Sequence, residues 1–153
     1  MTTGPQRLAA PPESRDGDPP VSRMMTRRII GITPDAPASA ALTLMASAGV
    51  HHLPVFYGNR CRAVLREADV IQHLAASPTS PVDRAATRVG RLIRPLTSVD
   101  MSARRSDAAR CMNAAGTDAV LVIGHHGPAG IVTAADLVRS LADERAHPES
   151  APS

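Results

Sequence analysis

The sequence almost lacks aromatic residues and contains no lysine. Of its 153 residues one is tyrosine, one is phenylalanine and none is tryptophan, so its 43% of apolar residues must build a core from aliphatic side chains and methionine. The aromatic platforms on which proteins stack nucleic-acid bases are therefore nearly absent, and a net charge of +3 is small for a nucleic-acid-binding surface. Nucleic-acid binding stays the weakest functional hypothesis, and it would depend on the arginines Arg23, Arg27, Arg28, Arg104 and Arg105.

Long hydrophobic runs and paired cysteines are also missing. No apolar stretch is long enough to span a bilayer, and no apolar segment typical of a signal peptide stands near the start. The two cysteines, Cys61 and Cys111, fall on a predicted strand and a predicted helix, and their spacing does not pair them. These features predict a reduced, cytoplasmic protein that does not insert into a membrane.

Signatures of catalysis and metal binding are lacking as well. The sequence has no Ser-His-Asp order, no P-loop and no glycine pattern of a Rossmann fold. Its two adjacent histidine pairs, at residues 51–52 and 125–126, have no nearby cluster of cysteines or carboxylates. Because adjacent residues on a strand point to opposite faces, a structural role is favoured over a zinc site. We expect no enzymatic activity, no metal and no required cofactor.

An internal repeat dominates the sequence. Residues 63–69 align with residues 130–136 at an offset of 67, and the same offset holds without a gap from Ile32/Val99 to Leu74/Leu141. Further upstream, residues 21–26 pair with residues 89–94 after a slip of one residue. Two tandem copies of one unit are therefore predicted, and each copy exposes an apolar sheet face that the other must cover.

Within each copy the hydrophobic pattern predicts the order strand, helix, strand, strand, helix. The fold class is α/β (α+β), with two β-α-β-β-α repeats packed sheet on sheet about a pseudo-twofold axis. The predicted elements are strands at 29–32, 53–56, 61–65, 97–100, 120–123 and 129–133, and helices at 38–48, 69–75, 104–115 and 134–144. The predicted domains are a disordered tail at 1–20, repeats at 21–75 and 89–143, a linker at 76–88 and a second tail at 144–153.

The second repeat ends in a candidate binding site. Thr133 stands where a strand meets a helix, so its hydroxyl can cap the helix, and the first-turn amides favour an anion such as phosphate. Asp136 follows by one turn, and its carboxylate could accept hydrogen bonds from two ribose hydroxyls. Gly130 and the small residues 134–135 are expected to leave room for a ligand, and the carboxylate is expected to be solvated in the empty protein. An isolated Thr-x-x-Asp would be better interpreted as a capping box, but the repeat, with Asp69 in the matching place, favours a site.

These motifs resemble a known family. The element order, the Met-Met-Thr opening, residues 49–55 (Gly-Val-His-His-Leu-Pro-Val) and residues 130–136 (Gly-Ile-Val-Thr-Ala-Ala-Asp) are similar to a free-standing pair of CBS domains, the Bateman module. The resemblance implies a disc with two clefts that bind adenosine-containing ligands such as AMP, ADP, ATP, S-adenosylmethionine or NAD. It also implies a regulatory role without catalysis, exerted on an unknown protein partner.

The resemblance assigns roles to individual residues. Asp136 would hold the ribose and Thr133 a phosphate or ribose oxygen, while apolar side chains at Leu96 and Ile131 would contact the base. The backbone lining of the adenine slot would come from Thr117, Asp118, Ala119 and Val120. The first repeat keeps Asp69 but has Arg66 where the family prefers Thr or Ser, so Arg66 would either fill that cleft or pair with a phosphate. His51 and His52, within the 49–55 motif, complete the set of ligand-binding candidates.

A second class of function remains open. The chain could be a ligand-free interaction module that dimerises and binds a partner. The helices at 38–48 and 104–115 carry more apolar and small residues than one buried face requires, which predicts a homodimer through these helices. Occupancy of the clefts would distinguish the two functions.

Overall fold

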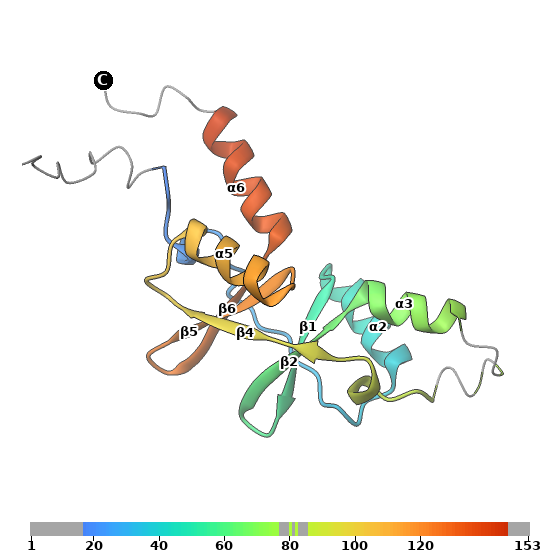
Figure 1. The fold of residues 1–153 in the computed structure, drawn as a ribbon. Coiled ribbons are helices and arrows are strands. Elements are labelled where there is room, and N and C mark those ends of the chain that lie inside the picture. Colours follow the sequence, from blue (N-terminus) through green and yellow to red (C-terminus); the bar gives the residue numbers. More distant parts are fainter. Residues whose placement is uncertain (1–16, 77–79, 81, 83–85, 147–153) are drawn as a thin grey trace, which may run out of the picture.

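The computed structural model describes residues 17–76, 80, 82 and 86–146, and it contains two copies of one α+β unit (Figure 1). The first copy comprises η1 (Val21–Arg23), α2 (Ala38–Ala48), β1 (His52–Tyr57), β2 (Arg60–Arg66) and α3 (Glu67–Ala76). The second comprises η2 (Val89–Arg91), β3 (Arg94–Pro95), β4 (Thr97–Asp100), α5 (Arg105–Ala115), β5 (Ala119–Gly124), β6 (Gly127–Thr133) and α6 (Ala134–Ala146). The predicted fold class and tandem repeat are confirmed.

Local sequence explains the bounds of the corresponding helices α2 and α5. Both end at a glycine in the left-handed conformation, Gly49 at φ 68° and Gly116 at φ 65°, which residues with a side chain rarely adopt. α2 begins directly after Pro37. α5 begins with a capping contact in which the Asp107 side chain accepts a hydrogen bond from the Arg104 backbone N–H at 2.8 Å.

Each half of the molecule completes its sheet with a segment of the other half. One sheet has the order β1-β2-β3 and the other β4-β5-β6, so β3 of the second repeat pairs with β2 of the first. In return, Thr26 of the first repeat forms an antiparallel bridge to Ile131 on β6. The pair Thr26–Ile131 matches the pair Arg94–Val64 under the repeat alignment with its one-residue slip. The two repeats are therefore interlocked.

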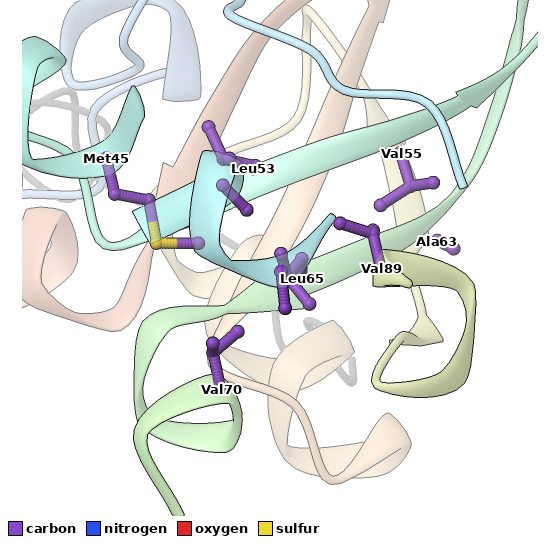
Figure 2. Packing of buried hydrophobic residues seen from close by; sticks show 9 residues of the cluster. Met45, Leu53, Val55, Ala63, Leu65, Val70 and Val89 are labelled. Atoms are coloured by element: carbon purple, nitrogen blue, oxygen red, sulfur yellow. The ribbon is translucent and has the colours of Figure 1, made fainter. Parts of the chain in front are cut away.

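The two hydrophobic cores are interlocked in the same way. Val89, on η2 of the second repeat, is fully buried in the core of the first half, beside Leu65 (Figure 2). Val21 and Met25, on and after η1 of the first repeat, belong to the core of the second half. Burial of such apolar side chains stabilises each half, on the order of 1.5–3 kcal/mol for a side chain of this size. Neither repeat has a complete core by itself.

The sheet faces that point away from these cores are covered too. Side chains alternate along a strand, so Pro54, Val64, Leu121 and Ile131 point away from the core clusters that hold their neighbours. All four are nevertheless buried. Pro54 and Ile131 also line one common pocket, so these faces of the two sheets lie towards each other. This arrangement supports the predicted packing of sheet on sheet.

The structure corrects several predicted boundaries. Residues 29–32 form no strand, and only Ile32 makes a bridge, to Val55. Residues 17–20, predicted to be disordered, instead lie against α5, where the Asp18 carboxylate accepts a hydrogen bond from the Ser106 backbone N–H at 2.8 Å. α6 continues to Ala146, into the predicted tail. The rest of both tails and part of the linker lie outside the described residues. In the described part of the chain no helix is both long and apolar enough to cross a membrane.

Exposed apolar side chains lie on other helices than predicted. Ile71 on α3 is 52% exposed, and Val138 and Leu141 on α6 are 65% and 50% exposed. α2 and α5, by contrast, bury Ala41, Met45 and their counterparts in the two cores. α6 projects from the body of the molecule in Figure 1, so its outer face is open. Dimerisation through α2 and α5 therefore stays a prediction, while the more exposed apolar side chains lie on α3 and α6.

Candidate functional site

Thr133 and Asp136 form a reciprocal capping box at the joint of β6 and α6. The Thr133 backbone N–H donates to Asp136 Oδ2 at 2.9 Å, and the Asp136 N–H donates to Thr133 Oγ1 at 3.3 Å. The Thr133 hydroxyl also donates to Asp136 Oδ2 at 3.0 Å. Asp136 is only 8% exposed, so the expectation of a solvated carboxylate is wrong. One oxygen of this carboxylate already stabilises the start of the helix.

The other carboxylate oxygen contacts a largely exposed arginine. Asp136 Oδ1 accepts a hydrogen bond from Arg139 Nη1 at 3.1 Å, and the Arg139 side chain is 68% exposed. Because this guanidinium lies mostly in solvent, water can solvate it when a ligand hydroxyl takes its place at Oδ1. Of the first-turn amides, Ala134 N–H is already bonded to the Asp118 carbonyl at 2.8 Å, which leaves less of the helix end for an anion.

A pocket of about 280 Å³ opens beside this carboxylate. Small-molecule sites typically occupy ~300–1,000 Å³, so the pocket is just below that range. Its wall is partly apolar, with Ile29, Ile30 and Val50 on one repeat and Ile131 on the other. Its charged and polar residues are Thr26, Arg28, His51, His52, Thr133, Asp136 and Arg139. The pocket therefore combines apolar side chains with hydrogen-bond acceptors and cationic side chains.

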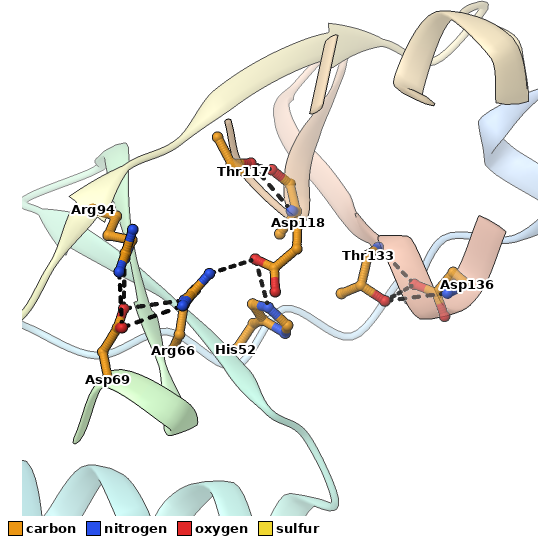
Figure 3. A network of polar contacts seen from close by, with 9 residues as sticks. His52, Arg66, Asp69, Arg94, Thr117, Asp118, Thr133 and Asp136 are labelled. Carbon is orange, nitrogen blue, oxygen red and sulfur yellow. Dashed lines mark hydrogen bonds and ion pairs between the residues drawn. The ribbon is translucent and has the colours of Figure 1, made fainter. Parts of the chain in front are cut away.

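The carboxylate of Asp69, in the equivalent place of the first repeat, has different surroundings (Figure 3). Its Oδ2 accepts hydrogen bonds from Arg66 Nε at 3.1 Å and Arg94 Nε at 2.7 Å. Its Oδ1 accepts from Arg66 Nη2 at 3.2 Å and Arg94 Nη2 at 3.0 Å. The Arg94 guanidinium, with Arg66 beside it, holds the pKa of the Asp69 carboxyl below its usual range. Both oxygens of this carboxylate are thus held by two bidentate guanidiniums.

A further contact joins this cluster to the pocket of Asp136. Arg66 Nη1 lies 3.6 Å from Asp118 Oδ1, and the same oxygen lies 3.2 Å from His52 Nε2 (Figure 3). Neither His52 Nε2 nor Asp118 Oδ1 has a well-aligned hydrogen-bond partner among the described residues, although both atoms are buried. The contact becomes an ion pair when the imidazole is protonated. His52 also lines the pocket of Asp136, so it connects this pocket to the polar cluster around Asp69.

The structure divides the predicted site residues between the pocket of Asp136 and other parts of the molecule, among them the polar cluster around Asp69. Thr133, Asp136, Ile131, His51 and His52 line one pocket together. The other predicted residues are not among those lining it: Leu96, Thr117, Asp118, Ala119, Val120, Asp69 and Arg66. Asp118 contacts Arg66, in the cleft of Asp69, and Val120 is fully buried in a core. The sequence analysis placed residues 117–120 and Asp136 in one adenosine site, but residues 117–120 do not line the pocket of Asp136.

The first copy of that loop lines the pocket of Asp136. Residues 49–52 match residues 116–119 under the repeat offset, and it is residues 49–52 that line the pocket of Asp136. The sequence interpretation also missed Thr26, the segment 28–30 and Arg139. Thr26 bridges to Ile131, so this segment reaches the pocket only because the repeats exchange strands. The expected space beside Gly130 is filled, since a Cβ there would stand 2.8 Å from the Thr26 carbonyl.

The described residues contain no group of three or more His, Cys, Asp or Glu side chains placed to hold a metal ion. The imidazole of His51 instead contacts Glu67, with Nδ1 3.3 Å from Oε1.

Comparisons with known proteins agree with this architecture. The family model of the CBS domain matches the chain twice, at residues 21–76 and 89–143. A comparison with curated proteins finds no match.

Solved structures resemble the chain closely in fold. The CBS domain of a bacterial CNNM/CorC family Mg²⁺ transporter in complex with ATP aligns with a TM-score of 0.67 at 18% identity, over 80% of this chain and 87% of that chain. CBSX2 in complex with AMP aligns with a TM-score of 0.65 at 23% identity, over 81% and 97% of the two chains. A hemolysin-like protein containing a CBS domain, from Oenococcus oeni PSU, aligns with a TM-score of 0.67 at 21% identity, over 81% and 90%.

Proposed function

The chain belongs to the CBS domain family, with both domains of a pair present, and we propose that it is a regulatory module that binds an adenosine-containing ligand. The proposed site is the pocket of Asp136. Its ligand would be a nucleotide or related compound, such as AMP, ADP, ATP, S-adenosylmethionine or NAD. Binding would alter how the module contacts a protein partner, and the module itself would catalyse no reaction.

One observation carries this proposal, namely the combination of groups in the pocket of Asp136. An apolar wall at Ile29, Ile30 and Val50 suits an adenine ring, and among the described residues Asp136 Oδ1 is held by one largely exposed arginine, Arg139. A carboxylate can accept hydrogen bonds from the two neighbouring hydroxyls of a ribose. Arg28 and Arg139 line the same pocket and would favour a phosphate group.

The structural relatives support the choice of ligand class. Two of them are complexes with ATP and with AMP, and both share this fold at identities below 25%. The comparison supports an adenine nucleotide, while the choice among nucleotides rests on this chain's own residues. A pocket of about 280 Å³ fits one nucleoside better than a dinucleotide.

The alternative, a dimeric interaction module without a ligand, is favoured by a different observation. Val138 and Leu141 on α6 are half exposed or more, and Ile71 lies at the matching place on α3. Such side chains would be covered by a second copy of the chain about a twofold axis. Dimerisation is compatible with ligand binding, so we propose a homodimer for either function.

A thermal-shift series with AMP, ADP, ATP, NAD and S-adenosylmethionine tests the proposal. A ligand present at ~100 times its dissociation constant stabilises the fold by about 2.7 kcal/mol, so the unfolding midpoint should rise with concentration and then follow the logarithm of free ligand. Sedimentation with and without ligand reports the oligomeric state in parallel. If none of these compounds raises the midpoint while the protein sediments as a dimer, the interaction module is the better assignment.

A further inference from the structure

We propose that the first cleft is closed by the chain's own arginines, and that Arg66 and Arg94 limit the protein to one bound ligand. This inference rests on the proposed function, because it concerns which of the two equivalent clefts takes the adenosine ligand. Arg66 and Arg94 bind the Asp69 carboxylate in the place where a ligand ribose would otherwise bind.

Both carboxylate oxygens of Asp69 already have hydrogen-bond donors. Its side chain is 12% exposed, and each of its two oxygens already accepts hydrogen bonds from both guanidiniums, at 2.7–3.2 Å. A ribose would have to displace charge-assisted bonds and would offer only neutral hydroxyls in return. Asp136 is held less firmly, since among the described residues one guanidinium, that of the mostly exposed Arg139, bonds to one of its oxygens.

The repeat alignment shows which residues of the second repeat correspond to the two arginines. Arg66 occupies the place of Thr133, and Arg94 occupies the place of Thr26, which also lines the pocket of Asp136. Asp69 therefore has two arginines, Arg66 and Arg94, at the places where the pocket of Asp136 has two threonines, Thr133 and Thr26. Thr133 bonds through its hydroxyl to Oδ2 of Asp136 and makes no bond to Oδ1, whereas Arg66 in the same position bonds to both oxygens of Asp69.

The ion pairs around Asp69 also connect the two repeats. Asp69 lies on α3 of the first repeat and Arg94 on β3 of the second, so their ion pair connects the repeats. Arg66 makes a second connection, to Asp118 before β5. This cluster also reaches the pocket of Asp136, because His52 lines that pocket and contacts the same Asp118 oxygen.

Exchange of the two pairs of residues tests the inference by isothermal titration calorimetry with ATP and with AMP. The parent should bind one nucleotide per chain. The double variant Arg66→Thr/Arg94→Thr should bind two, because it copies the surroundings of Asp136 to Asp69. The reverse variant Thr26→Arg/Thr133→Arg should bind none while retaining a cooperative thermal transition. Arg62→Thr, which changes an exposed arginine on the same strand as Arg66, is the matched control and should bind one.

The outcomes separate the two proposals. Two sites in the parent would overturn the closed cleft and leave the proposed function standing. A folded Arg66→Thr/Arg94→Thr variant that still binds one nucleotide would also overturn it. Absence of binding in the parent and in every variant would refute the proposed function itself. If Arg66→Thr/Arg94→Thr does not fold, the single variant Arg94→Thr decides, since a second, weaker site should then appear.

Discussion

Replacement of Asp136 can separate its two roles, in capping α6 and in binding the ligand. Asp136→Ala removes the acceptor for the Thr133 N–H and for the Thr133 hydroxyl, at 2.9 and 3.0 Å. Loss of such a cap costs about 1–2 kcal/mol. For a domain of this size that corresponds to a fall of roughly 3–10 °C in the unfolding midpoint.

Asp136→Ala should also lower ligand affinity, because it removes the hydrogen bonds to the ribose. Charge-assisted hydrogen bonds contribute about 1.5–3 kcal/mol, so loss of the ribose contacts should weaken binding roughly 10- to 150-fold. Asp136→Asn distinguishes the two effects, because its amide oxygen can still accept from the Thr133 N–H but carries no charge. It should recover most of the unfolding midpoint and remain defective in binding.

Calorimetric titration and thermal unfolding of the same samples measure both quantities. Asp143→Ala, at an exposed acidic residue on the same helix, is the control and should leave both unchanged. If Asp136→Asn binds nucleotide as tightly as the parent, the carboxylate serves only as a cap and does not hold a ribose. If Asp136→Ala unfolds at the parent midpoint, the capping box contributes nothing to stability.

Three other predictions concern pH, packing and assembly. The pKa of Asp69 is lowered in the folded state, so its ion pairs stabilise the fold above the unfolded value near ~4 and are lost as pH falls towards the folded value. Between about pH 5 and about pH 3 the parent midpoint should therefore fall further than that of Arg66→Thr/Arg94→Thr, and equal losses would contradict the ion pairs. Gly130→Ala should destabilise by about 1–3 kcal/mol in denaturant titration, because its Cβ would stand 2.8 Å from the Thr26 carbonyl; an unchanged midpoint would contradict this close contact. Leu141→Asp should convert a dimer to monomers in sedimentation, whereas Tyr57→Ser, at a similarly exposed site in a hairpin, should not; a variant that stays dimeric would exclude this face of α6.

Local signals in the sequence predicted most of the secondary structure. The predicted bounds of α2, residues 38–48, agree with the structure because Pro37 and Gly49 mark its two ends. The strands β5 and β6 were predicted to within two residues from their apolar runs. The predicted strand at 29–32 failed because its apolar residues have a neighbouring strand only at Ile32, which pairs with Val55. Apolar β-branched composition alone does not determine whether a strand has a partner.

The repeat was also visible in the sequence, including the slip of one residue between its upstream and downstream parts. In the structure that slip falls between Thr26 and Ile32, where the chain leaves one sheet and joins the other. The exchange itself could not be predicted, since a repeat alignment shows which residues are equivalent and contains no information on which copy they contact. Val21 and Val89 have equivalent places in the alignment, yet each is buried in the core of the opposite half.

The same limit explains why the lining of the Asp136 pocket differs from the predicted set of residues. Asp136 was correctly matched to Thr133, which is three residues away, because contacts within one helical turn follow from sequence spacing. Its distant lining was taken from residues 117–120 of the same repeat, whereas residues 49–52 of the other repeat supply it. Arg66 was recognised as a departure for the same local reason, but Arg94, 25 residues beyond Asp69, was not. The difference between the clefts needs both arginines, because with Arg66 alone Asp69 would resemble Asp136 in having one guanidinium partner. The property that distinguishes the two halves thus depends on a contact between repeats, which the repeat pattern by itself conceals.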